Sequence, residues 1–186
     1  MIDKEKIHFL QNEWTPLPRF RRSKDVPDLK DGMEFLKREI ERQKNMLNNR
    51  ELHGNQRFEA LKQMNRNIRR AQEVYSELVG SHYVEKHDLD GERVLEHVIP
   101  QNLLSDAYLE NHLEFQQIIA MPMVDLSAGS DQMLKRAGLA NINNNWWQPF
   151  RRYEMAGIEP RIYTTSGQQI NLSNWTLEDH FRLFSL

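Results

Sequence analysis

Residues 96–111 read EHVIPQNLLSDAYLEN, and this stretch decides how the middle of the chain is interpreted. Adjacent residues of a regular strand point to opposite faces, so Glu96 and His97 can face one site only where a strand ends. Pro100 predicts such an end, because proline cannot donate a hydrogen bond to a sheet. We therefore expect the acid and the histidine at the end of a strand, followed by an ordered loop.

The chemistry of this pair suits a divalent cation and a water molecule. A neutral histidine can accept a proton from water. A glutamate supplies the hard oxygen ligand that Mg²⁺ or Mn²⁺ prefers. Hydrolysis of a phosphodiester needs both a base and a cation that stabilises the extra negative charge. The alternative is a structural pair of hydrogen-bonded side chains.

Composition limits the class of protein. The 186 residues fit one compact domain, or one domain with an appended subdomain. A net charge of −2 gives no bulk attraction to nucleic acid, so such binding requires local basic patches. The absence of cysteine excludes disulfides, thiolate zinc sites and cysteine nucleophiles, and fits a reducing compartment. No apolar run approaches the roughly 18 residues of a membrane span, and the first residues lack a signal peptide's apolar segment, so we expect a cytoplasmic protein.

The first half of the chain predicts two amphipathic helices. Residues 1–27 show no sustained period and indicate an extended arm, either packed through its aromatic residues or in contact with nucleic acid. From Asp28, apolar residues recur at helical spacing, and the pattern resumes after a break near Gly54 and stops before Gly80. Residues 28–80 therefore predict an antiparallel helical hairpin.

The second helix carries a basic stripe, made of Lys62, Arg66, Arg69 and Arg70. Their spacing of i, i+4, i+7 and i+8 puts them on one side of the helix, away from the apolar face. Such a stripe is either a solvated surface or a phosphate contact.

Residues 81–138 predict the order strand, loop, strand, helix. Residues 82–85 and 94–99 are typical of a strand pair, and residues 115–126 indicate a further strand interrupted near Pro122. Ser127 or Ser130 can cap a short helix that Gly138 closes.

Residues 139–186 predict a small helix, hairpin, helix region. Residues 146–155 indicate a short helix, and Ser166-Gly167 a hairpin turn. Thr176 and Asp179 are typical of a capping box that opens a terminal helix. The fold class is therefore α+β.

The central motif resembles a known family. The run Glu96-His97-Val98-Ile99-Pro100-Gln101, followed by Leu104, Asp106, Leu109, Glu110 and Asn111, is similar to the motif in the HNH domain of RNA-guided CRISPR effectors. The likeness covers sixteen residues, 96–111. It implies an HNH-like ββα finger that clasps one metal. A vaguer likeness joins residues 149–158 to a tail that follows the finger in small bacterial and phage HNH proteins.

The resemblance also implies a role for each residue. His97 would be the general base, Glu96 would replace the family's usual aspartate as a ligand of Mg²⁺ or Mn²⁺, and Asn111 would brace the loop. The family's third position is an asparagine or histidine on the following helix, where Asp131 is best placed here. Gln132 and Asp125 are alternatives for that ligand. Arg151 and Arg152 would contact phosphate, or else face solvent or pair with acids.

The resemblance implies a metal-dependent HNH-type endonuclease that cleaves DNA, of a bacterial, phage or mobile-element type, and the lack of a long apolar run predicts no membrane partner. One alternative is an inactive HNH-like scaffold that acts as a protein-binding inhibitor or regulator. Another is a nicking nuclease that needs a partner protein for targeting.

Overall fold

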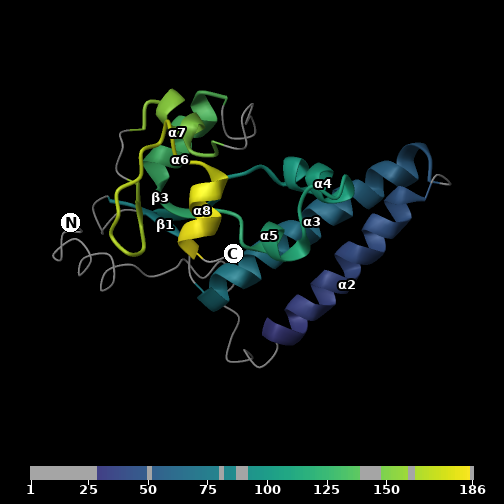
Figure 1. Ribbon diagram of the computed structural model, residues 1–186. Helices are drawn as coiled ribbons and strands as arrows, with labels where there is room; N and C mark the ends of the chain where they lie inside the picture. Colours follow the sequence, from purple (N-terminus) through teal and green to yellow (C-terminus); the bar gives the residue numbers. More distant parts are fainter. Residues whose placement is uncertain are drawn as a thin grey trace. The chain divides into compact units, whose positions relative to one another are not determined.

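The chain folds as an α+β protein in two compact units. The computed structural model describes residues 29–49, 52–79, 82–86, 92–138, 148–158 and 162–184. The helical unit comprises the described residues within 18–79 and 101–121. The sheet unit comprises those within 80–100 and 122–186 (Figure 1). The predicted arm at 1–27 lies outside the described residues.

Two long helices form the predicted hairpin in the helical unit. α2 spans Leu29–Asn48 and α3 spans Gly54–Val79, and they lie side by side (Figure 1). The apolar positions at helical spacing face each other, so both helices bury one stripe. The buried residues of this stripe include Leu36, Ile40, Leu47, Met64, Ile68 and Ala71.

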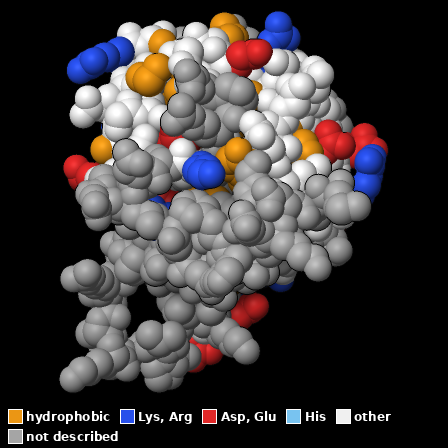
Figure 2. All heavy atoms as spheres, turned by 90° about the vertical axis from the view of Figure 1, so that its left-hand side faces the viewer, with side chains coloured by type: hydrophobic (Ala, Val, Ile, Leu, Met, Phe, Trp, Pro, Cys, Tyr) orange, Lys and Arg blue, Asp and Glu red, His pale blue; other side chains and the backbone are white. Residues whose placement is uncertain are grey.

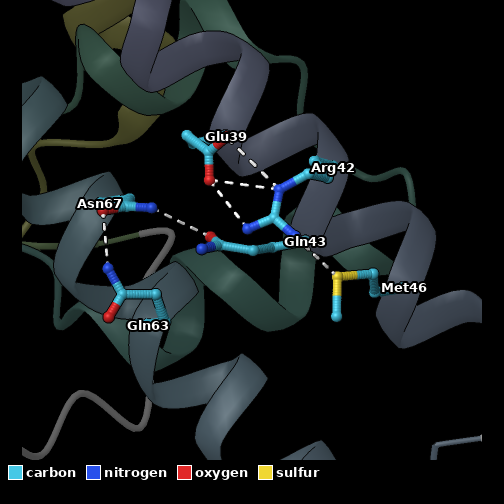
Figure 3. A network of polar contacts seen from close by, with 6 residues as sticks. All are labelled: Glu39, Arg42, Gln43, Met46, Gln63 and Asn67. Carbon is cyan, nitrogen blue, oxygen red and sulfur yellow. Dashed lines mark hydrogen bonds and ion pairs between the residues drawn. The ribbon is translucent and has the colours of Figure 1, made fainter.

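A polar contact crosses the interface between these helices. Buried Gln43 accepts a hydrogen bond from the amide of Asn67 at 3.2 Å, and Asn67 accepts one from Gln63 at 3.2 Å (Figure 3). Arg42, on the exposed side of α2, pairs with Glu39 at 2.9 Å. A buried amide loses its partner if one helix slides along the other, so the Gln43 contact specifies the register of the hairpin.

Two shorter helices complete the helical unit, and neither was expected from the sequence. α4 spans Gln101–Leu109, where an ordered loop was predicted. α5 spans Phe115–Ile119, so the prediction of a strand that begins at residue 115 is wrong. A capping box explains this helix, because Glu114 and Gln117 each bond the other's backbone N–H. This local pairing outweighs the β propensity of the apolar run.

The sheet has four strands in the order β2-β3-β1-β4. In chain order they are β1 (Tyr83–Glu85), β2 (Arg93–His97), β3 (Met123–Ser127) and β4 (Ile162–Thr164). β1 runs parallel to β3 and antiparallel to β4, and β2 runs antiparallel to β3. The predicted pairing of residues 82–85 with 94–99 is therefore wrong, because β3 lies between β1 and β2. All three residues of β1 are buried, as in a strand covered on both faces.

α6 (Ala128–Arg136) follows β3 directly and starts as predicted. The Ser127 hydroxyl accepts a hydrogen bond from the backbone N–H of Ser130 at 3.2 Å. The buried carboxylate of Glu85 accepts bonds from the Ser127 backbone N–H, at 2.7 Å, and from the Ser130 hydroxyl. Gly138, with φ of +70°, follows the helix, which confirms the predicted closure.

The C-terminal elements agree in outline with the prediction. The helix expected at 146–155 is α7 (Arg151–Met155), and residues 139–147 lie outside the described part. The hairpin turns at Gly167, whose φ is +87°. α8 (Leu177–Phe184) opens with the predicted capping box, in which Thr176 and Asp179 exchange hydrogen bonds of 3.0 and 3.1 Å.

An aromatic cluster lies between β1 and α8. The hydroxyl of buried Tyr83 accepts a hydrogen bond from the Trp175 ring nitrogen at 2.9 Å and bonds Nδ1 of His180 at 2.9 Å. The Phe150 ring meets Tyr83 edge-on, with centroids 4.8 Å apart. This cluster ties the terminal helix to the sheet.

Burial at this cluster makes stability depend on pH. Burial, with His180 beside it, lowers the pKa of His82 to about 3. Below about pH 6.5, His82 is protonated in the unfolded chain but stays neutral in the folded chain. The folded state therefore loses stability as the pH falls from about 6.5 toward 3. We expect the wild type to lose about 2 kcal/mol more than His82→Gln between pH 7.5 and pH 5, measured by urea unfolding. Exposed His112→Gln is the matched control, and equal losses for wild type and His82→Gln would contradict the assignment.

Candidate functional site

Glu96 lies at the end of β2 and is bound by an arginine from another part of the sequence. Its Oε1 accepts a hydrogen bond from Nη2 of Arg152, on α7, at 2.7 Å. The same nitrogen donates to the backbone carbonyl of His97 at 2.8 Å. The Arg152 side chain is only 2% exposed and that of Glu96 18%, so the ion pair is largely shielded from water. Both residues of the central pair are thus tied to α7.

Tyr153 also contacts the ion pair of Arg152 and Glu96, although the sequence analysis did not name it as a site residue. Arg152 donates a hydrogen bond to its hydroxyl at 3.4 Å. Burial raises the pKa of Tyr153, and the nearby carboxylates of Glu96 and Asp131 raise it further. Burial alone would lower the pKa of Arg152, but Tyr153 and Glu96 raise it above the ordinary value. Two predicted ligands, Glu96 and Asp131, therefore act electrostatically on one hydroxyl.

Asp131 lies in the first turn of α6, where the prediction placed it, and it has its own cationic partner. Its carboxylate pairs with Lys135, one turn later on the same helix. Asp125, an alternative ligand, is fully buried and forms an ion pair with Arg93. Gln132 is exposed on α6. The two aspartates in question are therefore both neutralised by neighbouring cations.

This donor set does not fit a divalent cation. Within the ranges that the structure describes, no three His, Asp or Glu side chains are grouped closely enough to hold a metal ion. Arginine keeps its proton in proteins, so a cation bound at Glu96 would lie beside a buried guanidinium that already holds Oε1, and the two positive charges would repel each other. In this geometry the Arg152 guanidinium stands beside Glu96 where the predicted metal was expected.

Asn111 has a clear structural role at the end of α4. Its φ of +59° lies in the left-handed region, which asparagine tolerates better than most residues. The backbone N–H of Asn111 bonds the carbonyl of Tyr108 at 3.2 Å, and that of His112 bonds Ala107 at 2.8 Å, the pattern of a Schellman motif. Asn111 is exposed and belongs to the helical unit, whereas Glu96 and His97 belong to the sheet unit.

The predicted basic stripe divides into two environments. Lys62, Arg66 and Arg69 line a groove of about 470 Å³ between α3 and α4. Lys62 lies 3.7 Å from Glu59, and Arg69 lies 3.1 Å from Glu73. Arg70 is half-buried and does not line the groove.

The two neighbouring arginines of α7 also differ. Arg151 is exposed, whereas Arg152 is buried against Glu96. On the face shown in Figure 2, the described Lys and Arg side chains lie apart from one another, with Asp or Glu side chains near several of them. Sequence reasoning treated Arg151 and Arg152 alike, although the apolar Phe150 and the aromatic Tyr153 beside them indicated that one face of α7 is buried.

The chain matched no protein-family model, no curated protein sequence and no solved structure. None of the described helices is both long enough and apolar enough to span a membrane.

Proposed function

We propose that this protein works by binding a partner rather than by cutting nucleic acid, as a noncatalytic scaffold with an HNH-like order of elements. One observation carries the proposal, namely the buried ion pair between Arg152 and Glu96. In a metal nuclease the carboxylate must be open to a cation, and that cation must be open to the phosphate. Here the carboxylate is held by a side chain that cannot lose its charge.

The ion pair also has the properties of a structural contact. The 2.7 Å bond to Glu96 and the 2.8 Å bond to the His97 carbonyl come from one nitrogen, so the end of β2 is fixed at two points. Breaking such a buried pair typically costs about 3–5 kcal/mol. Removing this pair to open the carboxylate to a cation would therefore cost stability, which does not favour a metal site here.

A metal-dependent DNA endonuclease, acting alone or with a targeting protein, is the second candidate. It is favoured by the order β2, β3, α6 and by the joint influence of Glu96 and Asp131 on the Tyr153 hydroxyl. Under this alternative His97 accepts a proton from water, and the cation shares the Glu96 carboxylate with Arg152 or takes the place of Arg152.

Metal titration and a cleavage assay separate the two functions. Isothermal titration of the purified protein with Mg²⁺ and with Mn²⁺ is expected to give no binding heat for wild type or Glu96→Gln. Plasmid, single-stranded DNA and structured RNA are expected to remain intact with either metal. A binding heat that Glu96→Gln abolishes, together with cleavage that a folded His97→Ala variant lacks, would overturn the binding proposal in favour of the nuclease.

A further inference from the structure

The groove between α3 and α4 has a lining suited to an anionic, planar ligand. One wall comes from α3, where the spacing of Phe58, Lys62 and Arg66 brings their side chains to the same face. The other wall comes from α4 and includes Asn102 and Asp106. Among the described residues that line the groove, three are cations and one is a carboxylate, in a protein whose net charge is −2.

The cations of the groove are not equally engaged. Lys62 and Arg69 have glutamate partners on α3, at 3.7 and 3.1 Å. Arg66 is exposed, and neither an ion pair nor a hydrogen bond joins its side chain to another residue within the described ranges. Arg66 is therefore the cation best placed to bind a phosphate, because a guanidinium presents a fork of donors to its oxygens.

An aromatic ring stands beside these cations. The Phe58 side chain is 63% exposed, and the Lys62 ammonium group lies 5.9 Å from its ring centre. Exposed aromatic rings next to a positive groove are the arrangement on which bases of a single strand stack. A duplex offers no such face, because its bases are already stacked on one another.

Polar groups on α4 complete the groove. The amide of Asn102 is exposed, and no hydrogen bond joins it to another residue in the described part of the chain. Gln101 is oriented by a 3.2 Å hydrogen bond to Gln72, and the Ser105 hydroxyl bonds Asn65 and the Gln101 carbonyl. An amide that is both donor and acceptor can bind the exposed edge of an unpaired base.

From this combination we infer that the groove between α3 and α4 binds single-stranded nucleic acid, with Arg66 and Lys62 on phosphates, Phe58 stacked on a base and Asn102 at a base edge. An acidic peptide would use the cations but would gain little from Phe58. This inference takes the proposed binding function as its premise and names the class of partner. The groove belongs to the helical unit, whereas the ion pair that carries the proposed function belongs to the sheet unit.

Fluorescence anisotropy with labelled single strands of mixed sequence tests this site. The probes are DNA and RNA oligonucleotides of the same sequence, a DNA duplex, and an acidic polyglutamate peptide, at low and at physiological salt. The whole 186-residue chain is expected to bind a single strand, with DNA and RNA distinguished by these two arms. Affinity should fall with salt, since phosphate contacts release counterions.

Three variants and a matched control locate the site. Arg66→Glu is expected to weaken binding about tenfold or more and to reduce the salt dependence. Phe58→Ala is expected to weaken it about tenfold, and Phe58→Trp to restore it, because stacking depends on the ring. Arg38→Glu makes the same charge change at an exposed position of α2 outside the groove and should leave the affinity within about twofold.

Four results would overturn the inference: no saturable binding of either single strand, equal binding by Arg66→Glu and wild type, preference for the duplex, or equal binding of polyglutamate without dependence on Phe58. Each of these removes the groove assignment but leaves the noncatalytic proposal standing. Cleavage of the oligonucleotide by wild type but not by His97→Ala would instead remove the noncatalytic proposal, while the affinity data for Arg66→Glu would still decide the groove.

Discussion

Replacement of Arg152 by alanine is expected to lower the free energy of unfolding by about 3–5 kcal/mol. The substitution leaves Glu96 without the cation that lies 2.7 Å away and removes the donor to the His97 carbonyl. Both acceptors lie in a largely buried place, so water replaces the lost contacts poorly. Urea unfolding followed by circular dichroism measures the change.

Arg151 provides a matched control for this experiment. It is the preceding residue of α7 and is exposed, so Arg151→Ala is expected to change stability by less than about 0.5 kcal/mol. The double variant Glu96→Ala with Arg152→Ala should lose less than the sum of the two single losses, because the pair is then removed together. A loss below about 1 kcal/mol for Arg152→Ala would show that the guanidinium does not hold the end of β2.

Replacement of Tyr83 by alanine is expected to cost about 3–5 kcal/mol of unfolding free energy. Tyr83 is fully buried in β1 and packs against Phe150. Its hydroxyl also bonds Trp175 and His180, each at 2.9 Å. The substitution leaves a cavity in the core and two polar groups without this partner.

The contribution of the hydroxyl can be separated from that of the ring. Tyr83→Phe keeps the packing and is expected to cost about 1–3 kcal/mol, because the Trp175 ring N–H and His180 Nδ1 lose their hydrogen-bond partner at a largely buried place. Tyr163→Phe, on the neighbouring strand β4, is the control, because its hydroxyl bonds the exposed side chain of Gln169 at 3.3 Å. We expect it to cost less than about 1 kcal/mol. Equal losses for the two phenylalanine variants would contradict a special role for the Tyr83 hydroxyl.

Elements that depend on local sequence could be predicted. α2 and α3 follow the 3.6-residue period of their apolar residues, and α6 and α8 start at serine and threonine caps. α5 was not predicted, because the β-branched residues at its end indicated a strand and the capping box at Glu114 and Gln117 was not recognised. Five residues give too short a window for a helical period to be visible.

The strand order could not be read from the chain. β1 and β2 are neighbours in sequence, which favours pairing, yet β3 and β4 flank β1 instead. All three residues of β1 are buried, and the strand pairs with residues as far away in the sequence as Thr164. No local pattern specifies such a contact.

Sequence reasoning named the carboxylates of Glu96 and Asp131 and gave pairing with acids as one alternative for Arg152, but it did not pair Arg152 with Glu96. Glu96 and Asp131 were expected to face a common place, and both raise the pKa of Tyr153. The partner of Glu96 lies 56 residues further along the chain, so its identity follows from tertiary packing alone. The partner of Asp131, Lys135, was within reach of sequence reasoning, because an acid and a lysine four residues apart on a helix commonly pair.

The insertion of α4 and α5 between β2 and β3 has a consequence for how the chain folds during synthesis. The α2–α3 hairpin can form from local contacts as soon as it is made. β2 cannot pair with β3 until residues 101–121 and β3 itself have been synthesised. β1 gains its second neighbouring strand only after β4 has been synthesised. The sheet unit is therefore expected to assemble late and slowly, and neither unit can be obtained intact by a single cut of the chain.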